Sequence, residues 1–179
     1  MRLVQKEGSM SHRVSLTLIG LLAIIANPAS ANSQGILTMN GLGEVHFGMT
    51  MDATERALNA RLTQPDHTPE SKSCWVHTRA DGSDPGTGYM IENGHLTRIQ
   101  INTPSRVLTE KRIGVGSSIA SLREAYGHSL FVEQNVDGDR FVLNAPSHRR
   151  AIIFETDGHS VVTFRAGEYP SVAYDEDCQ

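Results

Sequence analysis

Residues 88–103, GYMIENGHLTRIQINT, have the pattern of two short strands joined at a tight turn. The dipeptide Asn93-Gly94 at the centre favours a two-residue hairpin turn, because both central positions of that turn need a positive φ. After the turn, Ile99 and Ile101 stand two residues apart with a polar residue between them. That period is typical of a strand with one buried face. The stretch therefore predicts an antiparallel hairpin that contributes its isoleucines to a core.

A second stretch of the chain has the same plan. Residues 151–167, AIIFETDGHSVVTFRAG, place Asp157-Gly158 at the turn, 64 residues after Asn93-Gly94. On the return strand, Val162 and Phe164 alternate with polar residues, and this pattern predicts that both face a core. The chain is therefore expected to contain two hairpins of one type.

A short strand, a glycine and a helix precede each hairpin. The first set is residues 44–50 (EVHFGMT), followed by the helical pattern MDATERALNARL; the second is residues 112–118 (RIGVGSS), followed by IASLREAYG. The glycines that end the two strands are 68 residues apart. Thr50 and Ser118 stand where a helix N-cap belongs, since a hydroxyl there accepts a hydrogen bond from the first turn. Ordered features at nearly one offset indicate an internal duplication.

These paired features predict an α+β fold of two tandem units, each a short helix packed on a small antiparallel sheet. The first unit is expected to span residues 32–108 and the second residues 109–179. The further strands and loops are predicted at residues 64–71 (loop), 73–78 (strand), 80–88 (loop), 129–136 (strand) and 140–144 (strand).

The first 31 residues predict a cleavable secretory signal peptide. His12 and Arg13 precede a largely apolar run over residues 14–26. Pro28 ends that run, and small residues follow up to Ala31, which is the order of a secretory signal. About 13 apolar residues are too few to cross a hydrocarbon core of about 30 Å as a helix. We therefore expect a periplasmic or secreted protein, cleaved near Ala31, with no stable membrane span.

Charge and cysteine content narrow the expected partners and compartment. After residue 31 the chain has 13 basic and 19 acidic residues, a net charge of −6 with histidines neutral. An acidic chain without a basic cluster is not expected to bind nucleic acid. Cys74 and Cys178 form an even pair, which predicts a disulfide bond in an oxidising compartment.

Several motifs together resemble known families. They are residues 47–50 (FGMT), residues 113–116 (IGVG), the two hairpins and residues 173–178 (AYDEDC). A strand ending in Gly-Met-Thr, then a helix and a small antiparallel sheet, resembles the outer-membrane assembly lipoproteins. The tandem form resembles the β-lactamase inhibitor protein fold, and the chain looks most like uncharacterised exported bacterial proteins with this double pattern. The resemblance covers residues 43–178, and it implies binding to another protein.

The chain departs from this resemblance in two respects. Ser117-Ser118 stands in the second unit where Met49-Thr50 stands in the first. No cysteine stands directly after the apolar run of residues 14–26, so the lipid attachment of the assembly lipoproteins is not expected.

Five residues are candidates for binding: Trp75, His77, Tyr89, His95 and His159. The two aromatic residues are either exposed binding residues or core residues next to Cys74. His95 and His159 each follow the glycine of a hairpin turn. They form either a pair of related ligand or pH-sensitive sites, or exposed turn residues that were duplicated with their turns.

No catalytic residue, cofactor site or metal site is predicted. The histidines show neither the HxH nor the HExxH spacing of metal ligands, and no GxSxG is present. Ser117 and Ser118 begin a helix, where capping accounts for them. Gly114-Val115-Gly116 lacks the lysine and the longer glycine pattern of a phosphate-binding loop.

The leading expectation is an exported, non-enzymatic protein-binding module, with an inhibitor or an envelope-assembly accessory as specific forms. It would contact an envelope protein or cell-wall component through the open face of its sheets, or through the loops at residues 64–71 and 80–88. The alternative is a small periplasmic hydrolase or ligand-binding enzyme with a site between the two units. Convergence of two or more of His77, His95 and His159 with a carboxylate in one pocket would favour that alternative.

Overall fold

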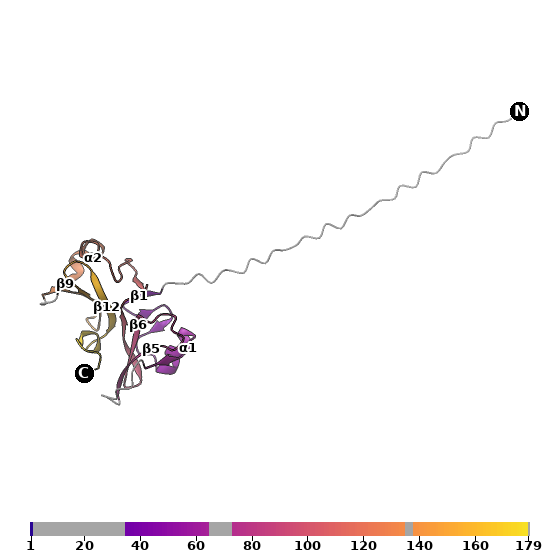
Figure 1. The fold of residues 1–179 in the computed structure, drawn as a ribbon, viewed down its shortest axis with the longest axis horizontal. Coiled ribbons are helices and arrows are strands. Elements are labelled where there is room, and N and C mark those ends of the chain that lie inside the picture. Colours follow the sequence, from indigo (N-terminus) through magenta and orange to yellow (C-terminus); the bar gives the residue numbers. More distant parts are fainter. Residues whose placement is uncertain (2–34, 65–72, 135–137, 179) are drawn as a thin grey trace. The chain divides into compact units, whose positions relative to one another are not determined.

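Antiparallel strands from both halves of the chain join in one eight-stranded sheet (Figure 1). The computed structural model describes Met1 and residues 35–64, 73–134 and 138–178. In chain order the elements are β1 (Ile36–Thr38), β2 (Gly41–Leu42), β3 (Val45–His46), α1 (Met51–Leu58), β4 (Leu62–Thr63), β5 (Cys74–Arg79), β6 (Thr87–Glu92), β7 (His95–Ile101), β8 (Leu108–Thr109), α2 (Ile119–Tyr126), η1 (Gly127–Ser129), β9 (Leu130–Glu133), β10 (Arg140–Asn144), β11 (Arg150–Thr156), β12 (Val161–Glu168) and η2 (Ser171–Ala173).

The order of the large sheet is β4-β5-β6-β7-β12-β11-β10-β9. A smaller mixed sheet has the order β3-β2-β1-β8. With two α-helices in the described residues, the predicted α+β class is confirmed. The predicted signal peptide, residues 1–31, lies outside the described residues except for Met1, as does most of the predicted loop at residues 64–71. Each α-helix has eight residues, and no helix in the described ranges is long and apolar enough to cross a membrane.

The predicted helix caps are confirmed. Thr50 Oγ1 accepts a hydrogen bond from the Ala53 N–H at 3.3 Å, and Ser118 Oγ accepts one from the Ser121 N–H at 3.1 Å. Each hydroxyl satisfies an otherwise free donor of the first helical turn. Figure 1 shows α1 beside β5 and β6, and α2 at the other end of the large sheet near β9.

The first hairpin has the predicted turn and the second does not. Glu92 pairs with His95 around Asn93-Gly94, and both turn residues have a positive φ. In the second hairpin Thr156 pairs with Val161, which leaves a four-residue loop. The Asp157 carboxylate accepts hydrogen bonds from the backbone N–H groups of residues 159 and 160, and this side-chain turn replaces the two-residue turn.

Two further predictions are corrected by the pairing. A register shift beside Thr156 places Val161, at 1 % exposure, in the core, whereas Val162 is 43 % exposed. Residues 113–116 form no strand, because the chain bends back and the Thr109 N–H donates to the Ile113 carbonyl at 2.8 Å. The strand that joins the small sheet is β8, which pairs in parallel with β1.

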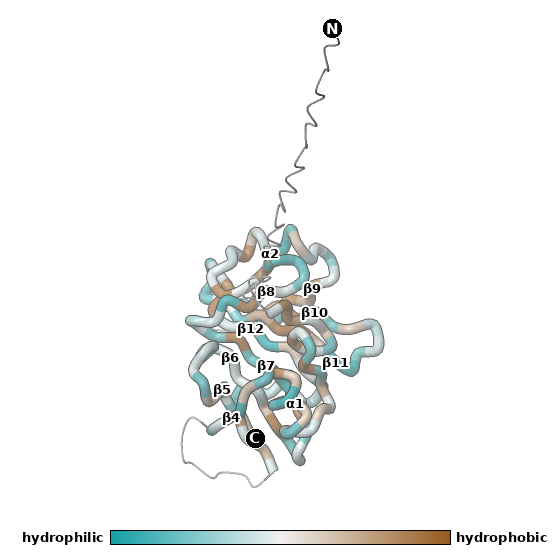
Figure 2. Tube along the Cα trace, turned by 90° about the vertical axis from the view of Figure 1, so that its right-hand side faces the viewer, coloured by the Kyte–Doolittle hydropathy of each residue, from teal (hydrophilic) through white to brown (hydrophobic). Residues whose placement is uncertain are grey.

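The large sheet has one apolar face, and the main core lies against it. Side chains alternate between the two faces along each strand. On this helix-facing side the buried residues form rows across neighbouring strands, and apolar segments follow these central strands in Figure 2. The rows comprise Tyr89, Ile99, Ala166 and Ile152, and next to them Ile101, Phe164, Phe154 and Phe141.

Gly48 and Gly116, which precede the two α-helices, contact the hairpins of their own halves in the same way. The Gly48 N–H donates to the Leu96 carbonyl at 2.8 Å, and the Leu96 N–H donates to residue 49 at 2.8 Å. In the second half, the Gly116 N–H donates to the Val161 carbonyl at 2.8 Å, and the Val161 N–H donates to residue 117 at 2.9 Å. β7 and β12, the last hairpin strands of the two halves, pair antiparallel with each other. This pair crosses the boundary predicted between residues 108 and 109.

Replacement of Phe154 by Ala is expected to lower the free energy of unfolding by about 3–5 kcal/mol. Phe154 is fully buried, and its ring centroid lies 5.7 Å from those of Tyr126 and Phe164. Phe131→Ala is the matched control, because Phe131 is 59 % exposed on β9 and its loss should change stability by less than about 0.5 kcal/mol. Urea unfolding of both variants measures the difference. Equal losses would contradict this assignment of the core.

Candidate functional site

Two of the five candidate binding residues, Trp75 and His77, line one pocket of about 500 Å³. Both lie on the helix-facing side of β5, since Trp75 pairs with Ile91 and His77 pairs with Tyr89. The other lining residues come from α1, β4, β6 and the adjoining turns: Met51, Leu62, Thr63, Gln64, Ser73, Ile91 and Gly94.

A buried carboxylate on α1 connects this helix to β4, and both elements contribute residues to the pocket. Glu55 is 7 % exposed, and its Oε1 accepts a hydrogen bond from the Leu62 N–H at 2.8 Å. Its Oε2 forms an ion pair with Arg61 at 2.8 Å. The helix is thereby connected to the short edge strand β4, and both elements contribute lining residues, Met51 from α1 and Leu62 from β4.

Of the lining residues that the structure describes, His77 is the one imidazole. It is 6 % exposed, and its Nδ1 has no hydrogen-bond partner among the described residues. Burial lowers the pKa of His77 below its ordinary value, and the nearby Glu55 carboxylate opposes this shift. The imidazole is therefore neutral at pH 7, so one ring nitrogen is a donor and the other is an acceptor. Leaving a buried polar atom unpaired costs roughly 1–3 kcal/mol, which a bound hydrogen-bonding group would offset.

The other three candidates lie elsewhere. Tyr89 is 1 % exposed within the core, and burial raises the pKa of its hydroxyl. His95 is exposed at the first hairpin turn, where its Nδ1 lies 3.0 Å from the Asn93 carbonyl. His159 is exposed in the loop of the second hairpin. Only His77 among the three histidines lines the pocket, and no carboxylate lines it with His77.

Metal binding gains no support from the arrangement of side chains. Across residues 35–64, 73–134 and 138–178, no group of three or more His, Cys, Asp or Glu side chains is placed to bind a metal ion. The residues lining the pocket include one imidazole and no cysteine. The chemistry available there is apolar contact and hydrogen bonding.

The opposite face of the sheet is covered at its centre by the C-terminal segment, residues 169–178. This face was the expected binding surface. The predicted disulfide is confirmed, with Cys74 on β5 bonded to Cys178 at a sequence separation of 104. Val172 of the segment is fully buried and packs in a small second core with Val142, Ala151 and Ile153.

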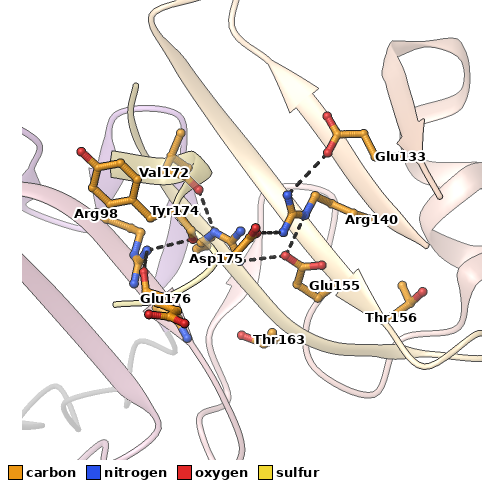
Figure 3. Close-up of polar contacts among 12 residues, drawn as sticks. Arg98, Glu133, Arg140, Glu155, Thr156, Thr163, Val172, Tyr174, Asp175 and Glu176 are labelled. Carbon is orange, nitrogen blue, oxygen red and sulfur yellow. Dashed lines mark hydrogen bonds and ion pairs between the residues drawn. The ribbon is translucent and has the colours of Figure 1, made fainter. Parts of the chain in front are cut away.

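Three arginines that the sequence did not single out contact this segment, and Figure 3 labels two of them, Arg98 and Arg140. Arg98 is 2 % exposed, and in the described residues all four of its side-chain hydrogen bonds go to the C-terminal segment. Their acceptors are the carbonyls of residues 171, 174 and 176 and the Asp177 carboxylate, the last at 2.6 Å. Burial lowers the pKa of Arg98 to about 10, and the Asp177 charge partly opposes the shift.

Arg165 and Arg140 extend this group across the sheet. Arg165 is 4 % exposed, donates to the Val172 carbonyl at 2.7 Å, and pairs with Glu155 at 2.9 Å. Arg140 pairs with Glu155 and with the exposed carboxylate of Asp175. Burial lowers the pKa of Arg165, opposed by Glu155, and the hydrogen bond to Arg140 holds the pKa of Asp175 below its usual range.

Strand alternation alone suggested that Arg98 and Arg165 face solvent. Both side chains lie on the sheet face opposite the main core, as alternation predicts. The C-terminal segment covers that face and buries them. The signal that could have revealed them is the acidic run of residues 175–177 beside Cys178. The disulfide to Cys74 brings this run onto the sheet, where a positive counterpart is required.

Replacement of His77 by Gln is expected to flatten the pH dependence of stability between pH 7 and 5. Because the folded-state pKa is depressed below 6.5, the unfolded chain binds the proton more readily. The wild-type chain keeps its full stability above about pH 6.5 and loses part of it as pH falls from the unfolded pKa toward the folded one. The loss is at most about 1.4 kcal/mol per pH unit, measurable by urea unfolding at several pH values.

The matched control for this titration is His95→Gln, a change at an exposed turn. That variant should keep the wild-type pH profile of stability. A His77→Gln profile as steep as the wild-type profile would show that His77 does not cause the loss.

Replacement of both cysteines by Ser is expected to lower the free energy of unfolding by up to about 4–5 kcal/mol. The disulfide closes a loop of 104 residues, and its loss restores conformational freedom to the unfolded chain. A dithiol reductant should destabilise the wild-type chain by a similar amount and leave the double variant unchanged. Urea unfolding with and without the reductant measures both effects, and no loss in either case would contradict the expectation.

Comparison with known proteins finds no similar protein. No family model, no curated protein and no solved structure matches the chain.

Proposed function

We propose that the protein is an exported, non-enzymatic binding module that takes an apolar side chain of an envelope protein into the pocket lined by Trp75 and His77. The observation that carries the proposal is a pocket that combines apolar side chains with a buried imidazole nitrogen that has no hydrogen-bond partner among the described residues. A side chain with a hydrogen-bonding end satisfies both features. Tyrosine is the simplest example, since its hydroxyl can either donate to Nδ1 or accept from it.

The position of Trp75 supports a protein as the partner. Trp75 is half-buried and His77 is buried, and both line the same pocket. Tryptophan at the edge of a pocket is the residue type that contributes most to protein interfaces, because it buries a large area with little loss of side-chain freedom. Ile91, Met51 and Leu62 complete an apolar lining for an inserted side chain.

The alternative is a small periplasmic hydrolase or ligand-binding enzyme with a site between the two units. Such a site needs the histidines to converge with a carboxylate. The three histidines occupy a pocket, a turn and a loop, and only His77 lines the pocket. A paired general acid and base would need a second titratable side chain near the same substrate, and neither a carboxylate nor a second histidine among the described residues lines the pocket. The arrangement therefore favours binding over catalysis.

The disulfide supports the exported location. Disulfides persist in oxidising compartments and are rare in the cytosol, so Cys74–Cys178 is compatible with a periplasmic or secreted protein. The signal peptide at residues 1–31 remains a prediction from the sequence.

We also propose that the chain consists of two tandem units related by duplication. The matched backbone contacts of residues 48 and 116 with the two hairpins support an origin by duplication. The offset of 65 that relates Leu96 to Val161 also relates Gln100 to Arg165, which lie directly opposite each other in the β7–β12 pair. An approximate two-fold axis relating two units would pass between them.

The proposal predicts a partner whose capture depends on the pocket. The exported chain, immobilised and incubated with envelope extract, should retain a reproducible protein identified by mass spectrometry. Trp75→Ala and His77→Leu should each reduce its recovery about tenfold or more, the loss expected for a central interface residue. Val162→Ala removes an exposed apolar side chain elsewhere and should leave recovery unchanged.

Urea unfolding of each variant first establishes that it is folded. A partner recovered equally by both pocket variants would place the interface elsewhere. Turnover of an envelope substrate by the purified chain, abolished in His77→Leu, would overturn the non-enzymatic proposal.

A further inference from the structure

The sheet face opposite the Trp75–His77 pocket has buried cations beneath the chain's own C-terminal segment. We propose that Arg98, Arg165 and Arg140 form a binding site for an acidic peptide, and that residues 174–177 occupy this site while the Cys74–Cys178 disulfide is closed. Side-chain alternation puts His77 and Arg98 on opposite faces, so this site is independent of the pocket.

The contacts in the site define the class of ligand. Residues 174–177 supply two backbone carbonyls and the Asp177 carboxylate to Arg98, and the Asp175 carboxylate to Arg140. Arg98 and Arg165 each donate in addition to a carbonyl of the part that stays in place, residues 171 and 172. Guanidinium groups suit such acceptors, because their N–H donors form a planar fork. A short peptide chain with carboxylate side chains supplies both kinds of acceptor.

The strand that bears Arg98 lies unusually close to β12 at Gly167. Gly167 lies directly across from Arg98 in the β7–β12 pair. A Cβ at Gly167 would lie 2.5 Å from the Thr97 carbonyl oxygen and 3.2 Å from Arg98 Cβ. A glycine on β12 therefore allows the close approach of the strand that bears Arg98.

Covering this face of the sheet with the C-terminal segment would not by itself require buried arginines. Arg98 and Arg165 are like charges on adjacent strands, and both are buried. Nε of Arg98 and one terminal nitrogen of Arg165 have no partner among the described residues. Apolar residues would cover the sheet without the desolvation of two cations. The unpaired donors leave the site able to bind more acceptors than the C-terminal segment supplies.

The part of the segment over Arg98 is held mainly by the disulfide. Val172 is its fully buried apolar residue, whereas Asp175, Glu176 and Asp177 are exposed. The side chains of Asp177 and Asp175 are 64 % and 69 % exposed, so water can hydrate their carboxylates when the segment moves away from the arginines. When the covalent bond opens, residues 174–177 can leave the arginines while Val172 stays in place.

A dithiol reductant can open the bond. A thiolate of the reductant attacks Sγ of Cys178, which is half-buried, and Cys74 leaves as a thiolate and takes up a proton. The second thiol of the reductant then attacks the mixed disulfide and releases Cys178 as a thiol. The Cys74–Cys178 bond thereby accepts two electrons and two protons, and the reductant becomes a disulfide.

The test uses a fluorescein-labelled synthetic peptide, Ala-Tyr-Asp-Glu-Asp, and fluorescence anisotropy with the exported chain. The oxidised chain should not bind the peptide. The chain reduced by a dithiol and the Cys178→Ser variant should bind it at least tenfold more tightly than the oxidised chain, and added salt should weaken this binding. The control peptide Ala-Tyr-Asn-Gln-Asn, without side-chain carboxylates, should not bind.

Two further variants in the Cys178→Ser background separate a binding site from a purely structural contact. Arg98→Gln should reduce peptide affinity at least tenfold. Asp177→Asn changes an exposed residue and weakens the segment's own hold on Arg98, so affinity for the added peptide should rise. This second variant keeps the proposal testable even if Arg98→Gln does not fold.

The proposal is overturned if opening the disulfide does not increase peptide binding, or if the amide peptide binds equally well. It is also overturned if Asp177→Asn leaves the affinity unchanged. Because the arginine site and the pocket are on opposite faces, Trp75→Ala should not alter peptide binding. Failure of one proposal therefore leaves the other intact.

Discussion

The pairing of β7 with β12 is the interaction on which the rest of the structure depends. Backbone hydrogen bonds between these strands join the two halves of the chain in one antiparallel sheet. Their register places Ile99 beside Ala166 on one face, and Gln100 beside Arg165 on the other. The first face becomes the main core, and the second receives the arginines. A shift of one residue would exchange the faces and put Arg98 in the apolar core.

The two faces present different chemistry to a partner. On the helix-facing side, a pocket combines the apolar side chains of Met51, Leu62 and Ile91 with one neutral imidazole. On the other side, Arg98 is surrounded by carbonyls and a carboxylate. Apolar burial favours a hydrophobic side chain in the first case, and charge-assisted hydrogen bonds favour an acidic main-chain segment in the second. A single sheet can thereby carry two sites with different ligands.

Local features were predictable, and features that depend on distant contacts were not. The caps at Thr50 and Ser118 and the turn at Asn93-Gly94 follow from residues within four positions of each other. The second hairpin departs from its predicted turn because the Asp157 side chain competes for the backbone donors. The parallel pairing of β1 with β8 has no local pattern, since its strands lie about 70 residues apart.

The sequence by itself determined the α+β class, the first hairpin turn, the helix caps and the disulfide. Each depends on a short pattern or on the only cysteines in the chain. Tertiary structure alone decided that Trp75 and His77 share a pocket, whereas His95 and His159 lie outside it. It also decided that Arg98 is buried rather than exposed, because strand alternation gives the face of a residue but not what later covers that face.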